Sequence, residues 1–133
     1  MKVLIIGFGS IGKRHYDVLS QLSEVQNIDL VTKQNIENIV CYINLEIIKN
    51  IEEYDYFVIA SETNKHFEQL KFLEENVKNK LIFCEKPLFE SKQDIEIKNN
   101  IVFVGYVLRF HPLLEKLKEM IKEEKILLVN AKC

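Results

Sequence analysis

Short runs of consecutive apolar residues dominate the pattern along the chain. Most of them are rich in β-branched or aromatic residues, and they are apolar at successive positions rather than at alternating ones. Such runs are typical of strands that are covered on both faces of a parallel sheet. The pattern predicts six strands, at residues 2–6, 28–32, 38–43, 55–61, 80–85 and 100–106.

Helical periodicity occupies three of the intervals, at residues 11–23, 65–75 and 112–124. Asn64 is a candidate N-cap for the second of these helices, and Pro112 suits the first turn of the third. Two other connecting segments show a weaker helical pattern. Residues 44–53 have room for about two helical turns, and residues 88–98 predict at most a weak, polar helix.

Strands that alternate with helices predict right-handed βαβ units. We therefore expect an α/β fold with a doubly wound (Rossmann), mostly parallel sheet over residues 1–124. Residues 125–133 read as a further strand. A final apolar strand without a partner would be an exposed edge, so we expect these residues to begin a second domain that is truncated here.

Composition and charge narrow the class of protein. The 133 residues are 47% apolar and 29% charged, which is ordinary for a globular domain, and the net charge of −2 gives no sign of a nucleic-acid or anionic-membrane partner. No apolar run approaches the ~18 residues of a membrane span. The apolar start is soon followed by Gly7 and the cations Lys13 and Arg14, which do not suit the apolar region of a secretory signal, so we expect none here. We predict a cytoplasmic protein.

The three cysteines, Cys41, Cys84 and Cys133, lie far apart and show no C-x-x-C spacing. This arrangement is neither a disulfide framework nor a zinc site. Cys41 and Cys84 fall within predicted strands, where we expect small buried side chains. No cluster of acidic residues and histidines lies near them, so we predict no metal.

A glycine loop follows the first predicted strand and opens the first predicted helix. In Gly7-x-Gly9-x-x-Gly12, the first glycine permits a tight turn, the second lets the backbone approach a pyrophosphate, and the third packs the helix close to the strand. The helix N-terminus adds free N–H groups and partial positive charge. A glycine turn that serves packing alone is the alternative. We predict a dinucleotide site that includes the loop residues Gly7, Phe8, Gly9, Ser10, Ile11 and Gly12.

The end of the second predicted strand bears on which dinucleotide is bound. NAD sites usually carry Asp or Glu about 20 residues past the loop, where it bonds the ribose 2′-hydroxyl. Here Thr32 and Lys33 occupy that place, and Asp29 lies toward the other end of the strand. A hydroxyl and a cation suit a 2′-phosphate better than a diol, so the sequence favours NADP over NAD. A solvated surface lysine is the alternative for Lys33.

Four segments together carry a family resemblance: "GFGSIGKRH" at the N-terminus, "IASETNKH" after the fourth predicted strand, "CEKPL" after the fifth and "VGYVLRFHP" after the sixth. With them the chain resembles the N-terminal portion of the glucose–fructose oxidoreductase/inositol dehydrogenase (Gfo/Idh/MocA) family. The resemblance implies an NAD(P)-dependent oxidoreductase that transfers a hydride to or from a carbinol carbon of a sugar, polyol or sugar derivative.

The resemblance assigns the catalytic role to Lys86, which matches the lysine beside the nicotinamide and the reacting hydroxyl. A partly desolvated lysine at the carboxyl end of a strand faces the ligand crevice and can assist proton transfer. We expect Glu85 to orient Lys86 at the cofactor, and Pro87 to make the turn rigid, with a cis bond as one way of doing so. The alternative is a solvated turn whose ion pair contributes under ~1 kcal/mol.

Further positions match the family one by one. Ser61 and Thr63 would touch the cofactor's ribose or phosphates, while Glu62 stands where the family usually has proline. His66 matches a histidine at the start of the following helix, and we interpret it as supporting the cofactor loop rather than as the general base. Arg109 matches an arginine on the substrate side, with a helix-capping or surface role as the alternative.

The family's second domain supplies substrate contacts and an Asp/His pair, and family members usually associate through its sheet, which makes a homo-oligomer possible. We therefore expect this chain to bind NADP or NAD without turnover, and a carbohydrate-like substrate to require the full-length protein. We expect Tyr106 and Phe110 to lie in the core. Two alternatives stay open: a complete, non-catalytic nucleotide sensor or assembly protein, and a flavin or S-adenosylmethionine protein, which would explain the glycines but not "EKPL".

Overall fold

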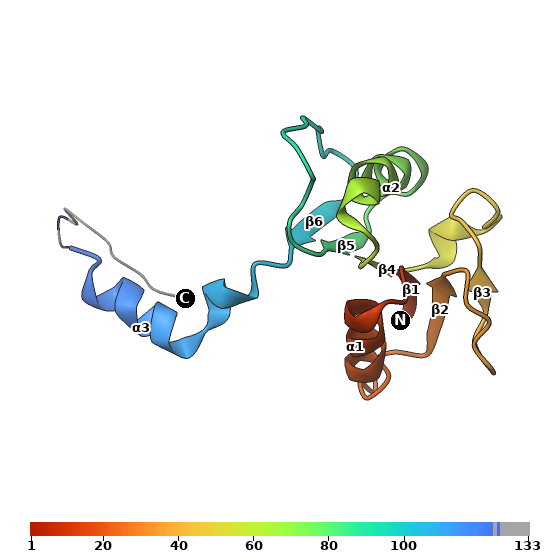
Figure 1. Ribbon diagram of the computed structural model, residues 1–133, viewed down its shortest axis with the longest axis horizontal. Coiled ribbons are helices and arrows are strands. Elements are labelled where there is room, and N and C mark those ends of the chain that lie inside the picture. Colours follow the sequence, from red (N-terminus) through yellow and green to blue (C-terminus); the bar gives the residue numbers. More distant parts are fainter. Residues whose placement is uncertain (124, 126–133) are drawn as a thin grey trace.

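The computed structural model describes residues 1–123 and 125. Its centre is a six-stranded, wholly parallel sheet in the order β3-β2-β1-β4-β5-β6 (Figure 1). The strands are β1 (Lys2–Ile6), β2 (Asn27–Val31), β3 (Cys41–Tyr42), β4 (Tyr56–Ile59), β5 (Leu81–Cys84) and β6 (Ile101–Val104). The strand order reverses between the central neighbours β1 and β4, which is where such sheets bind ligands. The predicted doubly wound α/β fold is confirmed.

The three predicted helices are present as α1 (Ser10–Leu19), α2 (Thr63–Asn76) and α3 (Pro112–Met120), and two short 3-10 helices are η1 (Ile51–Glu53) and η2 (Val107–Phe110). Pro112 occupies the first turn of α3 as expected. The predicted Asn64 cap is wrong. The N-cap of α2 is Glu62, whose backbone is extended, and Asn64 already lies inside the first helical turn.

Two predicted elements are shorter than expected or missing, for local reasons. The strand predicted at residues 38–43 is reduced to Cys41–Tyr42, because Asn38 adopts a left-handed backbone (φ 62°) that interrupts an extended run. Residues 88–98 contain no helix. The end of this segment is held instead by the buried Glu74 carboxylate, which accepts from the backbone N–H groups of Lys98 (2.7 Å) and Asn99 (2.6 Å).

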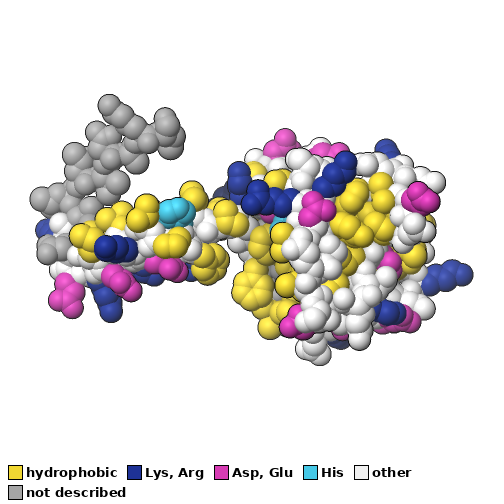
Figure 2. All heavy atoms as spheres, turned by 90° about the horizontal axis from the view of Figure 1, so that it is seen from below, with side chains coloured by type: hydrophobic (Ala, Val, Ile, Leu, Met, Phe, Trp, Pro, Cys, Tyr) yellow, Lys and Arg dark blue, Asp and Glu magenta, His cyan; other side chains and the backbone are white. Residues whose placement is uncertain are grey.

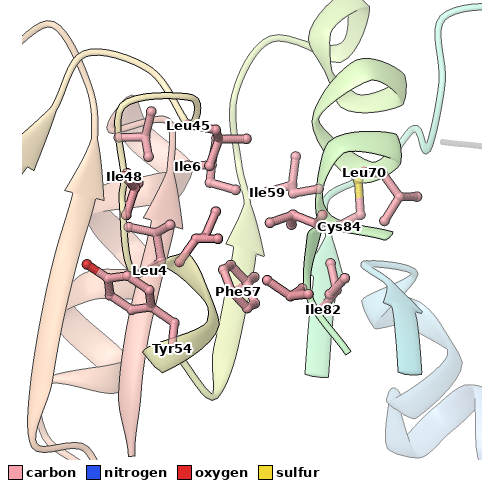
Figure 3. Close-up of a cluster of buried hydrophobic side chains, with 14 residues drawn as sticks. Leu4, Ile6, Leu45, Ile48, Tyr54, Phe57, Ile59, Leu70, Ile82 and Cys84 are labelled. Carbon is pink, nitrogen blue, oxygen red and sulfur yellow. The ribbon is translucent and has the colours of Figure 1, made fainter. Parts of the chain in front are cut away.

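Apolar side chains cover both faces of the central strands, as their continuous apolar runs predict. On one face, residues of β1, β4 and β5 point toward α2 and the segment that carries η1 (Figure 3). On the other face, Val3, Ile5 and Val58 pack with Leu19 of α1. Cys84 is fully buried and Cys41 half-buried, while Cys133 lies outside the described residues.

The segment after β6 departs from expectation. Figure 1 shows α3 extending away from the sheet, and Figure 2 shows apolar side chains along its surface. Tyr106 and Phe110 were expected in the core, but they are 54% and 73% exposed because nothing in the described part of the chain covers them. The strand predicted at residues 125–133, and with it the expected start of a second domain, lies outside the described residues except for residue 125. None of the helices that the structure describes has the length and apolar character of a membrane span.

Candidate functional site

Two glycines of the loop after β1 are required by the fold itself. Gly7 has φ 96°, and a Cβ on it would lie 2.6 Å from the Cα and N atoms of Ser61. A Cβ on Gly12 would collide with the Gly7 carbonyl. The first turn of α1 therefore sits directly against the end of β1, and the loop sits against the end of β4.

Gly9 is different, because neither packing nor backbone conformation requires glycine there. It is the N-cap of α1 with φ −75° and ψ −163°, an extended conformation open to any residue. A Cβ built on it meets no atom within 4 Å. Packing alone therefore does not explain Gly9, whereas a ligand that approaches the backbone at the helix N-terminus does.

A cleft of about 740 Å³ opens at the end of the sheet where the parallel strands have their carboxyl ends. The volume is within the range of small-molecule sites. Its walls come from the glycine loop, the carboxyl ends of β2 and β4, the start of α2 and the segment after β3. The predicted site residues that line it are Gly7, Phe8, Gly9, Ser10, Ile11, Thr32, Lys33 and Ser61. Gly12, Thr63, His66, Glu85, Lys86 and Arg109 are not among the lining residues.

At one end of the cleft, the loop after β2 is joined to the glycine loop. Gln34 donates from its side-chain amide to the Phe8 carbonyl (3.0 Å), and its backbone N–H donates to Thr32 Oγ1 (3.2 Å). Lys33 is exposed, and Glu46 also lines the cleft. Asp29 lies outside it, buried in β2, where it accepts from the Tyr54 hydroxyl (2.6 Å).

The loop after β4 is braced by α2. Ser61 Oγ donates to Gln69 Oε1 (2.6 Å), and both residues line the cleft. Glu62, at the position where the family usually has proline, forms an ion pair with Lys65 (2.9 Å), and the hydrogen bond from Lys65 lowers the pKa of the Glu62 carboxyl. Thr63 is the first residue of α2.

The Glu-Lys-Pro turn (residues 85–87) follows β5 at the same edge of the sheet. The expectation that Glu85 orients the Lys86 side chain is not what the structure shows. Glu85 accepts from His15 Nε2 (2.8 Å), and it contacts Lys86 only through that residue's backbone N–H (3.3 Å). The Lys86 side chain is exposed, and its ammonium has no hydrogen bond or ion pair with any described residue. The Lys86–Pro87 peptide is cis.

His66 joins this turn to the loop after β4. Its ring is almost completely buried, with Nε2 3.1 Å from the Ser61 carbonyl and Nδ1 3.2 Å from both the Pro87 and the Leu88 carbonyls. This geometry supports the interpretation of His66 as a residue that braces the site's loops. It leaves no ring nitrogen free to contact a ligand directly.

Arg109 lies in η2 with its side chain exposed. The helix-capping alternative does not apply to α3, because the cap there is His111, which accepts from the Leu113 N–H. Among the residues that the structure describes, no three His, Cys, Asp or Glu side chains form a group that could hold a metal ion.

Sequence reasoning missed the residues Gln34, Glu46, Gln69 and His15. His15 carried a usable signal, since it lies three residues past Gly12 and therefore on the helix that the glycine loop opens. Gln34 comes two residues after Thr32, close to a position already singled out. Glu46 and Gln69 carried no local signal, because only the folded chain brings them to the cleft.

Comparisons with known proteins agree with this arrangement. The family model described as "Oxidoreductase family, NAD-binding Rossmann fold" (GFO_IDH_MocA) matches residues 1–106. A comparison with curated proteins found no match.

Similar solved structures include the putative oxidoreductase yvaA from Bacillus subtilis (22% identity, TM-score 0.72), a probable dehydrogenase from Thermotoga maritima (25%, 0.68) and a Gfo/Idh/MocA family oxidoreductase from Vibrio cholerae (17%, 0.66). The alignments cover 92%, 92% and 94% of this chain, and 39%, 41% and 44% of the respective neighbours. The chain thus spans about two fifths of the length of these proteins.

Proposed function

Because the chain belongs to the Gfo/Idh/MocA family of oxidoreductases, with its NAD-binding Rossmann fold, we propose that the cleft over α1 binds a nicotinamide dinucleotide for hydride transfer. The substrate class we propose is a sugar, polyol or sugar derivative that reacts at a carbinol carbon. The glycine loop would hold the diphosphate, and the turn after β5 would present Lys86 to the reacting oxygen.

The observation that carries this proposal is the open space above Gly9. A glycine with ordinary dihedral angles and no neighbour near its missing Cβ is unexplained by the fold alone. It lies at the N-terminus of α1, where unpaired N–H groups and the helix dipole favour an anion. A diphosphate fits this chemistry, and its close approach to the main chain requires that the Cβ be missing.

We assign the adenosine end of the cofactor to the loop after β2, with NADP favoured over NAD. Thr32 and Lys33 both line the cleft there, and Lys33 is a cation without an ion-pair partner among the described residues. A 2′-phosphate would supply that partner. For NAD, the ribose hydroxyl would need a carboxylate from another wall of the cleft, and Glu46, from the segment after β3, is one candidate that lines it.

The nicotinamide ring, when bound, accepts or supplies the hydride. The role of this chain in the reaction is to move a proton at the substrate oxygen, and we assign that role to Lys86. Its backbone follows a strand that ends at the crevice edge of the sheet, and its ammonium is free of protein partners among the described residues.

Turnover by the 133-residue chain alone should be negligible. Hydride transfer needs a site from which water is excluded, whereas the Lys86 side chain is exposed in this structure. Binding and turnover are therefore separate expectations. The chain should bind cofactor through the loops described above, and a shielded reaction site would need further surface around Lys86.

Titration calorimetry with NADP, NAD and S-adenosylmethionine tests the proposal. Wild type should bind a nicotinamide dinucleotide and not S-adenosylmethionine. Gly9→Val should remain folded, because its side chain enters open space, and should lose at least about tenfold in affinity by blocking the diphosphate. Ser20→Val, at the exposed C-terminal end of α1, is the matched control and should bind as wild type. Equal affinities for wild type and Gly9→Val, or no binding to wild type, would overturn the proposal.

A further inference from the structure

His15 and Glu85 form a hydrogen-bonded pair that links two motifs 70 residues apart. His15 lies on α1, one turn beyond Gly12, and Glu85 opens the Glu-Lys-Pro turn after β5. The imidazole donates from Nε2 to Glu85 Oε1 at 2.8 Å, and the two side chains are only 24% and 18% exposed. A short, partly buried bond to a carboxylate holds its groups more firmly than an exposed surface pair.

Residues from three elements surround the hydrogen bond between His15 and Glu85. The His15 ring packs edge-on against Phe83, with ring centroids 5.2 Å apart. On the other side, Gly105 follows β6, and a Cβ there would lie 3.0 Å from Glu85 Oε2 and 3.1 Å from the Phe83 ring. A side chain at residue 105 would therefore push against the pair. α1, β5 and the end of β6 all meet at one carboxylate.

The opposite end of the same turn is held by a second histidine. His66 lies against the carbonyls of Pro87 and Leu88, while Glu85 Oε2 accepts from the Lys86 backbone N–H. The backbone of the turn is thus fixed on both sides of Lys86, while the Lys86 side chain itself remains free. Positioning a reactive group requires a rigid backbone and a functional group that is not already bound to the protein, and Lys86 has both.

α1 connects this turn to the glycine loop. Its first residue, Ser10, follows the open Gly9, and His15 lies five residues further, about 7.5 Å along the helix axis. From this geometry we infer that His15 is a positioning residue: through Glu85 it fixes Lys86 relative to the diphosphate-binding end of the same helix. The role of Lys86 rests on the proposed function. The hydrogen bond from His15 to Glu85, which we call the clamp, does not.

Hydrogen exchange and ligand affinity test the inference on the whole chain. In His15→Leu, the backbone amides of Glu85 and Lys86, which donate to the Ile59 carbonyl and to Glu85 Oε2, should exchange about tenfold faster, the factor that corresponds to losing one such hydrogen bond. Affinity for NADPH should fall severalfold, while affinity for 2′-phospho-ADP-ribose, which lacks the nicotinamide, should stay within about twofold. Glu85→Gln, which keeps the shape of the side chain but removes its charge, should change exchange in the same direction.

Two controls separate positioning from general damage. His15→Gln keeps a side-chain N–H donor and should restore slow exchange and the NADPH affinity, at least in part. Arg14→Leu changes an exposed neighbour on α1 and should behave as wild type. Unchanged exchange at Glu85 and Lys86 in both His15→Leu and Glu85→Gln would overturn the inference, as would an equal loss of affinity for both ligands.

The proposed function can fail separately. If wild type binds no dinucleotide, the proposed function falls, while the exchange rates of Glu85 and Lys86 still decide whether the clamp exists. If wild type binds and the clamp variants show neither faster exchange nor selective loss of NADPH, the positioning role falls and the cofactor site stands.

Discussion

A Cβ atom on Gly7 would lie 2.6 Å from the Cα of Ser61, so the loops that follow β1 and β4 touch through their backbones. This contact brings the glycine loop beside the loop that supplies Ser61 to the cleft. The three glycines of the loop differ, since the fold requires Gly7 and Gly12, whereas a Cβ on Gly9 would meet no atom within 4 Å, as the proposed diphosphate site requires.

Gly7→Ala should therefore destabilise the protein by at least about 2 kcal/mol, because it combines a left-handed backbone with a backbone collision. Gly9→Ala should cost at most about 1 kcal/mol, the scale of an N-cap change. Urea unfolding followed by circular dichroism measures both. Equal losses for the two variants would contradict the division of roles.

Lys33→Glu should change the cofactor preference. Replacing the cation with a carboxylate should lower NADP affinity by at least about tenfold through repulsion of the 2′-phosphate, and should leave NAD affinity within about threefold. Fluorescence titration with NADPH and NADH measures the ratio. Lys49→Glu, an exposed lysine outside the cleft, is the control and should not change it. A parallel loss of NADPH and NADH affinity would show that Lys33 does not read the 2′-phosphate.

Glu74 should make stability depend on acid pH. Burial raises the pKa of its carboxyl, but the hydrogen bonds from Asn99, Lys98 and Asn100 outweigh that effect and hold it below the ordinary value of 4.5. A group with a lowered pKa in the folded state stabilises fully above its unfolded pKa, and the contribution is lost as pH falls through the folded pKa. Stability attributable to Glu74 should therefore be constant above about pH 4.5 and fall below it.

Glu74→Ala should cost about 3 kcal/mol at neutral pH, because it leaves buried backbone N–H groups without an acceptor. Glu74→Gln should cost less and should flatten the acid limb of the stability profile. Glu75→Gln, at the exposed neighbouring position, should leave both unchanged. An unaltered acid limb in Glu74→Gln would show that another group causes it.

Cys84 should be chemically inert in the folded protein. Burial, and secondly the charge of Glu85, raises the pKa of its thiol to about 12, so almost no thiolate is present at pH 8. Cys41, which is only half-buried, should react with iodoacetamide much faster. Mass spectrometry of digested protein after timed labelling assigns the sites. Labelling of Cys84 as fast as Cys41, without unfolding, would contradict the buried placement of β5.

The apolar runs predicted the sheet because strands buried on both faces have no polar side to break the pattern, as Val3 and Leu4 illustrate on adjacent positions of β1. They did not predict how far β3 pairs, because the left-handed turn at Asn38 has little signature in the sequence. The apolar positions of α3 are real, but periodicity identifies a face that can be buried and not the surface that buries it.

The candidate site also has a part that the sequence predicts and a part that it does not. The glycine loop could be predicted because its residues are adjacent in the chain and each has a physical reason to be there. The partner of Glu85 could not, since local charge suggested Lys86 next to it, whereas folding brings His15 from 70 residues away. The fold, which packs the His15 ring against Phe83 and leaves both His15 and Glu85 mostly buried, brings this partner to Glu85 rather than the neighbour in sequence.

The proposed diphosphate site at the glycine loop is tested most directly by titrating ¹⁵N-labelled protein with NADP and following each amide in two-dimensional NMR spectra. If the glycine loop holds the diphosphate, the largest shifts at low NADP concentration should occur at the backbone N–H groups of Gly9, Ser10 and Ile11, with further shifts at Thr32 and Lys33. Saturable binding that leaves these five amides unmoved, or that instead moves residues around Asp29 and Tyr54, would contradict it.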